Sequence, residues 1–164
     1  MAALGDALGA LAPPERPVAI EWPDALFVDG GLVGGGRLAW PENTADDAIP
    51  AWLVFGAMIR VASMTDMEAG LHPLATALED EGFGAAASDR LVEGFARHVM
   101  VAIDRWREDG FDALAATYLS RLRFEPGARC ALDDLGNLLV RRPRRSIERR
   151  VLRSMLEMPS WLDP

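Results

Sequence analysis

Apolar and polar positions change their spacing about halfway along the chain, so the two halves predict different structures. The first half has short apolar runs separated by glycine, proline or acidic residues, which is typical of strands. After residue 88 the apolar residues recur every three or four positions, which predicts amphipathic helices. Strands followed by helices favour an α+β fold with a mixed or antiparallel sheet.

In the first half the clearest local signal is Asp29-Gly30-Gly31 between two apolar runs. This pattern favours a tight hairpin, because a type I′ turn needs positive φ at two successive residues. The expected elements are a helix at 2–11, short strands at 18–22, 25–28 and 32–40, a polar loop at 41–50, and a buried strand at 51–64. On length alone, the last of these also fits a helix.

The second half predicts a long helix pair at 88–108 and about 111–123, separated by Gly110. A small hairpin follows, with strands at 128–132 and 137–142. The final element is predicted as a short helix at about 146–158 with arginines on its exposed face. Trp161 is expected to pack this end of the chain against the body.

Composition limits the class of protein. The chain has 164 residues, half of them apolar, which suits one domain with a small appendage. Its longest apolar run, 48–64, is too short and too interrupted to predict a membrane span, and residues 1–11 lack the positively charged region expected of a signal peptide. A single cysteine, Cys130, fits a reducing cytoplasm. No pair of His or Cys residues has the spacing of a metal site.

Charge is distributed unevenly, and every basic residue is an arginine. Residues 1–140 carry a net charge of −12 (10 Arg against 22 acids), and residues 141–164 carry +4 (7 Arg against 3 acids). The acidic body argues against general nucleic-acid binding. RRPRRSIERR (141–150) either neutralises this body from an exposed face or contacts a phosphorylated or acidic partner or nucleic acid.

WPDALFVDGGLVGGGRLA (22–39) resembles the central segment of biotin–protein ligases, in the biotin/lipoate ligase superfamily. There a Lys-Trp-Pro-Asn-Asp strand leads through a hairpin to Lys-x-x-Gly-Ile-Leu and later to Gly-Ile-Gly-Ile-Asn. The matching stretches here are 21–25, 32–37 and 56–60. The helix at 92–111 and DDLGNLLVRR (133–142) resemble the family's later helix and its small C-terminal β unit, in the same order.

The resemblance implies that two phosphate-facing lysines of the family are replaced here by Glu21 and Leu32. No shift of the alignment restores them, because the chain has no lysine. Removing one electrostatic donor of this kind typically costs about 10²–10³ in rate. Arg37 is the nearest substitute cation, but its odd offset from Leu32 along a strand predicts the opposite face of the sheet.

The ligand-binding candidates that the resemblance implies are Trp22, Asp24, Gly34, Gly35, Gly36, Arg37 and Arg60. The three glycines would let a ligand lie against the strand backbone, or they form a close-packed kink or bulge. Trp22 would stack on the ligand or pack in the core.

The resemblance also implies a division into a partial catalytic domain, 1–125, and a small β hairpin with an Arg-rich helix, 126–164. The family's adenylate-binding Gly-Arg-Gly-Arg segment is not found in this sequence. The chain is therefore expected to begin at the middle of the catalytic domain, as a truncated protein or gene model or as a shortened relative.

Three functions remain open. The first is a ligase-like protein with a degenerate site that needs no cofactor in this form. The second is a working ligase in a longer gene product, using ATP with biotin or lipoate and an acceptor protein. The third is an interaction module that acts through its Arg-rich tail. An exposed apolar edge would follow from a missing half, and we expect it to promote homodimer formation or poor solubility.

Overall fold

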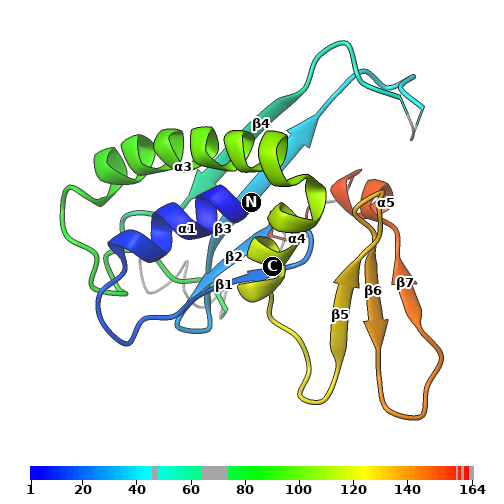
Figure 1. Cartoon of the computed structure of the whole chain (residues 1–164). Coiled ribbons are helices and arrows are strands. Elements are labelled where there is room, and N and C mark those ends of the chain that lie inside the picture. The colour runs from blue at the N-terminus through cyan, green and yellow to red at the C-terminus, as the bar shows by residue number, and fades with distance from the viewer. Residues whose placement is uncertain (46–47, 64–73, 158, 160, 163–164) are drawn as a thin grey trace.

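The chain folds into a four-stranded antiparallel sheet with helices on one face, beside a smaller three-stranded antiparallel sheet (Figure 1). The computed structural model describes residues 1–45, 48–63, 74–157, 159 and 161–162. This architecture confirms the α+β fold that the change of spacing predicts, and both sheets are antiparallel in all of their strand pairs.

The larger sheet has the strand order β1-β2-β3-β4, with β1 (Val18–Glu21), β2 (Ala25–Val28), β3 (Gly31–Ala39) and β4 (Val54–Ile59). Its covering helices are α1 (Ala2–Leu11) and α3 (Ala87–Asp109), and α4 (Phe111–Ser120) leads on to the second sheet. That sheet contains β5 (Arg129–Leu132), β6 (Leu138–Arg141) and β7 (Glu148–Arg150), and α5 (Leu152–Glu157) follows it.

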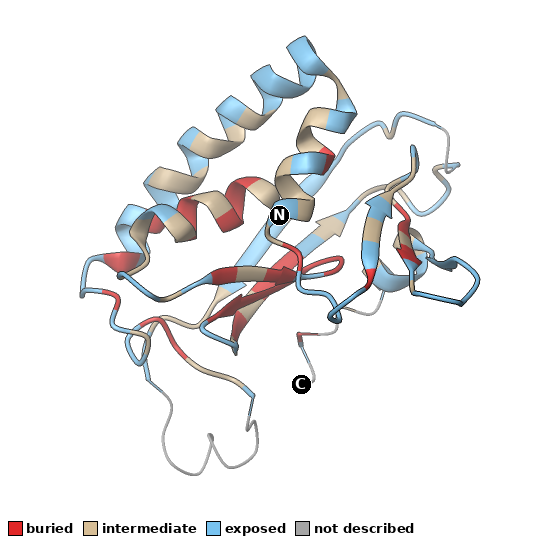
Figure 2. Cartoon of the chain, turned by 60° about the horizontal axis from the view of Figure 1, so that its bottom comes forward, coloured by how far each residue is buried: buried red, intermediate tan, exposed pale blue. Residues whose placement is uncertain are grey.

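The main core lies between the larger sheet and α1, which α3 covers in turn (Figure 2). Leu4 and Leu8 of α1 are buried against a row of sheet residues that includes Ile20, Leu26 and Val33. Burial of a leucine side chain contributes roughly 2 kcal/mol, so this short helix is stabilised by packing more than by its own propensity. On the opposite face of the sheet, no helix is present among the described residues (Figure 1).

The hairpin between β2 and β3 is confirmed. Val28 pairs with Gly31, which leaves Asp29 and Gly30 as the two turn residues, and both have positive φ, at 46° and 89°. This is the backbone that a type I′ turn requires, and Asp-Gly adopts it at low cost.

The predicted helix pair is also confirmed, as α3 and α4. Gly110 separates them with a φ of 80°, a value that favours glycine. The last residues of the predicted second helix are not helical. They run beside β1, where the Ile20 amide donates to Arg121 O and the Arg123 amide donates to Ile20 O.

The prediction of a buried strand at 51–64 is wrong in burial and in length. The strand found there, β4, lies at the edge of the sheet, and among the described residues its only strand partner is β3. Phe55 and Ile59 are half-buried against the core, whereas Val54 and Met58 on the other face are exposed. An apolar run indicates that a segment tends to be buried. Whether another element covers it depends on the tertiary arrangement, which the run does not specify.

The predicted helix at 146–158 is wrong over its first half. Residues 148–150 form β7, which pairs with β6 and turns the expected hairpin into a three-stranded sheet. Only α5 is helical, and residue 158 lies outside the described residues. Pairing with β6 supplies hydrogen-bond partners to the backbone of 148–150, and this tertiary contact outweighs the helical spacing of the apolar residues.

Two negative observations apply to the residues that the structure describes. No helix there is both long and apolar enough to cross a membrane. No group of three or more His, Cys, Asp or Glu side chains is arranged there to hold a metal ion.

Candidate functional site

The face of the larger sheet on which no described helix packs, called here the open face, holds several of the predicted site residues. Paired residues of neighbouring strands point to the same side of a sheet. The register pairs Glu21 with Ala25, Ala25 with Gly35 and Gly35 with Met58, which forms one row across all four strands. A second row contains Phe27 and Leu32.

A β-bulge in β3 corrects the expected direction of Arg37. Leu26 pairs with Gly34 while Phe27 pairs with Leu32, so Val33 is an extra residue on the β3 side. The extra residue shifts the alternation by one, and Leu32, Gly35 and Arg37 therefore share the open face. The expectation that Arg37 faces away from Leu32 is wrong, because it assumed a regular strand.

The glycines at 34–36 are each closely packed by the protein itself. A Cβ on Gly34, which has a φ of 141°, would lie 2.0 Å from Met58 O. A Cβ on Gly35 would lie 2.4 Å from Asp24 O and from the Trp161 ring, and one on Gly36 would lie 2.5 Å from the Met1 sulfur. These approaches account for glycine at all three positions as a bulge and close packing, without a ligand.

Trp161 packs the C-terminal end onto the open face, as predicted. Its side chain is buried together with Ala25, Phe27 and Leu32, and its Nε1 donates a hydrogen bond to Gly36 O at 3.1 Å. The indole thus lies against the strand that a ligand was expected to contact. Beside it, a cavity of about 300 Å³ is lined by Leu32, Gly34, Met58, Arg60, Trp161 and Leu162, among others.

Charged groups border the open face, and one of them was missed by sequence reasoning. Glu21 is exposed, Leu32 is buried, and Arg37 is exposed. Arg60 lies two residues after Met58 and lines the cavity. Arg123 places its guanidinium 4.1 Å from the centroid of the Phe27 ring, which brings a cation to this face. The pairing of residues 121–123 with β1 has no signature in the sequence, so no pattern could have predicted the position of Arg123.

Asp24 is buried, and neither of its carboxylate oxygens has a hydrogen-bond partner among the described residues. Burial raises the pKa of this carboxyl from 3.8 to about 6. Close by, the Tyr118 hydroxyl donates to Pro23 O at 3.1 Å. Burial, and then the charge of Asp24, raise the pKa of Tyr118 above its usual range.

Trp22 is placed away from the open face. It is buried in a cluster with Leu122 and with Ala128, Leu138 and Val140. The last three belong to residues 126–164, called here the C-terminal unit. This position matches the packing interpretation of Trp22, and the side chain joins the two sheets.

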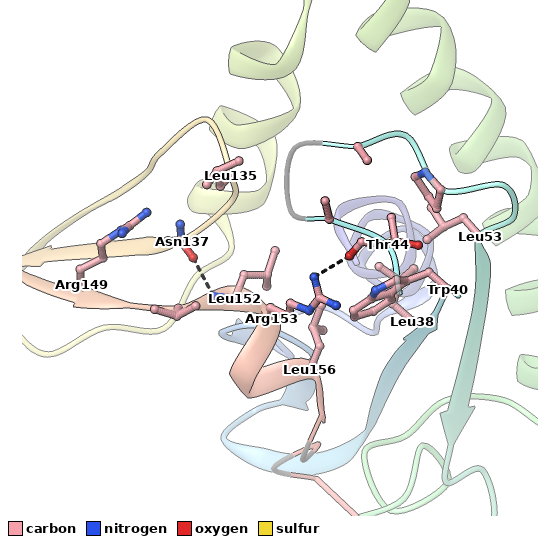
Figure 3. Close-up of a pocket in the computed structure, with 14 residues that line it drawn as sticks. Leu38, Trp40, Thr44, Leu53, Leu135, Asn137, Arg149, Leu152, Arg153 and Leu156 are labelled. Atoms are coloured by element: carbon pink, nitrogen blue, oxygen red, sulfur yellow. Dashed lines mark hydrogen bonds between the residues drawn. The ribbon is translucent and has the colours of Figure 1, made fainter. Parts of the chain in front are cut away.

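A second cavity, of about 330 Å³, lies between the end of β3 and the C-terminal unit (Figure 3). Its walls are mainly apolar and include Leu38, Trp40, Leu53, Leu152 and Leu156. Arg153 crosses this region and donates to Thr44 O at 2.8 Å, which ties α5 to the segment after β3. None of the predicted site residues lines this cavity.

The model of the biotin/lipoate A/B protein ligase family matches residues 1–120. No curated protein gives a match. Among solved structures, a biotin protein ligase-like protein from Silicibacter sp. TM1040 is similar, with 30% identity and a TM-score of 0.73. That similarity covers 93% of this chain and 69% of the other chain.

The biotin protein ligase of Aquifex aeolicus shares the fold, with 16% identity and a TM-score of 0.68 over 90% of this chain and 68% of that one. A variant of the Aquifex enzyme in complex with biotin has a TM-score of 0.67 at 14% identity, over 92% of this chain and 65% of that one. The family match covers well over half of the sequence and agrees with the motifs at 21–25, 32–37 and 56–60. The chain belongs to the biotin/lipoate A/B protein ligase family.

Proposed function

We propose that this chain is a biotin/lipoate ligase-like protein whose adenylation site is degenerate. One observation carries the proposal. The two positions where the resemblance implies phosphate-facing lysines both lie on the open face, and they hold an exposed carboxylate, Glu21, and a buried apolar side chain, Leu32.

An acyl-adenylate does not fit these residues. Adenylation depends on electrostatic stabilisation of the charge that develops at phosphorus, and each lost donor costs about 10²–10³ in rate. Glu21 adds repulsion, and the apolar cluster of Leu32, Phe27 and Trp161 offers no donor beyond an indole N–H already bonded to Gly36 O. We therefore derive no reaction step through ATP at this face.

The apolar part of the site supports ligand binding better than its charges support adenylation. The cavity beside Trp161 has the size of a small-ligand pocket, with apolar walls and one cation, Arg60, among its lining residues. Biotin or lipoate, each an apolar body with a carboxylate, suits that combination. In this proposal the chain keeps acyl-ligand binding without the adenylation chemistry.

A working ligase with altered cations is the second candidate, and two observations favour it. Arg123 lies over Phe27, and the bulge places Arg37 on the same face as Leu32. Both guanidiniums would then substitute for lysines. This candidate also requires a Gly-Arg-Gly-Arg segment, which residues 1–164 do not contain.

The test is transfer of biotin or lipoate to an acceptor protein in the presence of ATP, followed by mass spectrometry of the acceptor. We expect no labelled acceptor from this chain. If acceptor is labelled, and Arg123→Gln abolishes the labelling while Arg107→Gln on α3 does not, the second candidate replaces the first. Binding of biotin or lipoate measured by calorimetry tests the retained pocket separately, with Arg60→Gln expected to weaken it.

A further inference from the structure

Three acids on or beside the small sheet, Glu125, Asp133 and Glu148, are matched by arginines. Arg142 donates to both carboxylate oxygens of Glu125, at 2.8 and 3.1 Å, and also to Glu148. Arg150 pairs with Glu148 at 2.7 Å, and Arg149 pairs with Asp133 at 2.9 Å. These ion pairs use the carboxylates that lie close to the small sheet.

Four further arginines of the C-terminal unit, Arg129, Arg141, Arg144 and Arg145, form no ion pair within the described part of the chain. All four are exposed. In contrast, Arg142, Arg149 and Arg150 are each held by a carboxylate. The clustering of the other four therefore needs a different explanation.

These four side chains surround one hollow. Arg129 and Arg141 are direct partners in the β5–β6 register, which places two like charges side by side and is unfavourable without an anion between them. The β6–β7 loop adds Arg144, Arg145 and Ser146, and the hollow has a volume of about 490 Å³ with no acidic residue among its lining residues.

We propose that this hollow is a binding site for a phosphate group carried by a small molecule. Guanidinium groups form paired hydrogen bonds with phosphate oxygens, and a concave set of them suits a compact polyanion better than a flat protein surface does. Nucleic acid is disfavoured because no aromatic side chain lines the hollow for base stacking and because residues 1–140 carry −12.

The site is separate from the open face of the larger sheet. Val140 and Leu138 of β6 pack against Trp22 and Leu122. Alternation along β6 turns Arg141, and its partner Arg129, to the other side of the small sheet. The proposal therefore stands whether or not the open face binds an acyl ligand.

The test is calorimetric titration of the full chain with inorganic pyrophosphate, ATP, AMP and sulfate at low salt. We expect pyrophosphate or ATP to bind, and the double variant Arg129→Gln/Arg141→Gln to lose at least tenfold in affinity. The control, Arg90→Gln/Arg107→Gln on α3, makes the same change of net charge and should leave the affinity unaltered. Equal affinity for pyrophosphate and ATP identifies the phosphate chain itself as the ligand, and tighter ATP binding identifies a nucleotide.

Three results would overturn the proposal. The first is binding no stronger than that of sulfate, which indicates an adventitious ion only. The second is ATP binding that the Arg129→Gln/Arg141→Gln variant does not weaken, which places the nucleotide elsewhere on the chain. The third is tighter binding of a single-stranded oligonucleotide than of pyrophosphate, which would make the surface a nucleic-acid contact.

Discussion

At the scale of single residues, the most unusual group beside the open face is the buried carboxylate of Asp24. The resemblance places an asparagine at this position, and here a carboxylate lies buried beside Pro23 and Trp161 without a hydrogen-bond partner among the described residues. A charge in such a place is costly unless it is protonated. The resemblance implies Asp24 as a ligand-binding candidate, and that role stays a prediction; the burial of its carboxylate has no signal in the local sequence.

Replacing Asp24 by asparagine should stabilise the protein at neutral pH and leave its stability at pH 3.5 nearly unchanged. The folded pKa of about 6 lies above the unfolded value of 3.8, so the favourable contribution of the neutral acid is complete below pH 3.8. It is lost as the pH rises to 6, a loss of roughly 3 kcal/mol. Urea unfolding of both proteins at pH 3.5 and pH 8 measures the difference. Asp104→Asn, on the exposed side of α3, is the control, and an equal gain at both pH values would contradict the account.

The other residues of the open face divide into those that patterns can place and those that they cannot. Leu32 and Glu21 followed from motif spacing, and the register puts both on this face. The direction of the Arg37 side chain could not be predicted from strand alternation, because Val33 forms a bulge that shifts the alternation by one residue. Arg123 reaches the face through the pairing of residues 121–123 with β1, a tertiary event with no local signal.

At the scale of elements, the local turn signals and the β5–β6 hairpin were confirmed, whereas two features that depend on neighbouring strands were not. Asp29-Gly30 predicted the turn and Gly110 predicted the helix boundary. Both predictions were confirmed because the tendency to adopt positive φ is a local property of the residue type. Residues 148–150 form a strand because β6 lies alongside them. The exposure of β4 likewise depends on its position at the sheet edge, which no local pattern predicts.

The glycines of β3 provide a test at this scale. Gly34→Ala should destabilise the protein by more than about 2 kcal/mol, because a Cβ there meets Met58 O and the φ is positive. Gly56→Ala in β4 is the matched control, since open space surrounds that position, and it should be neutral or slightly stabilising. Thermal unfolding measures both. A tolerated Gly34→Ala would remove the packing explanation and return the glycines to a role in ligand binding.

For the whole molecule, the family and the fold class were predictable because motif order along the chain carries them. The association state was not predictable in the same way. The edge strand β4 leaves Val54 57% exposed and Met58 63% exposed, and its outer backbone has no strand partner among the described residues. Natural proteins usually protect such an edge.

We predict that this edge causes concentration-dependent self-association. Sedimentation velocity over a wide concentration range should show an increasing weight-average mass, and Val54→Lys should reduce it by placing a charge on the edge. Val92→Lys, at an exposed apolar position of α3, is the control for a general gain of solubility. A strictly monomeric wild-type chain, or an equal effect of both variants, would count against association through β4.

ATP–pyrophosphate exchange with biotin or lipoate measures adenylation alone, so it tests directly whether the open face supports that step. We predict exchange no faster than in a reaction without protein, for the wild-type chain and for Arg123→Gln alike. Ligand-dependent exchange by the wild-type chain, lost in Arg123→Gln and kept in Arg107→Gln, would contradict it and establish Arg123 as the replacement cation.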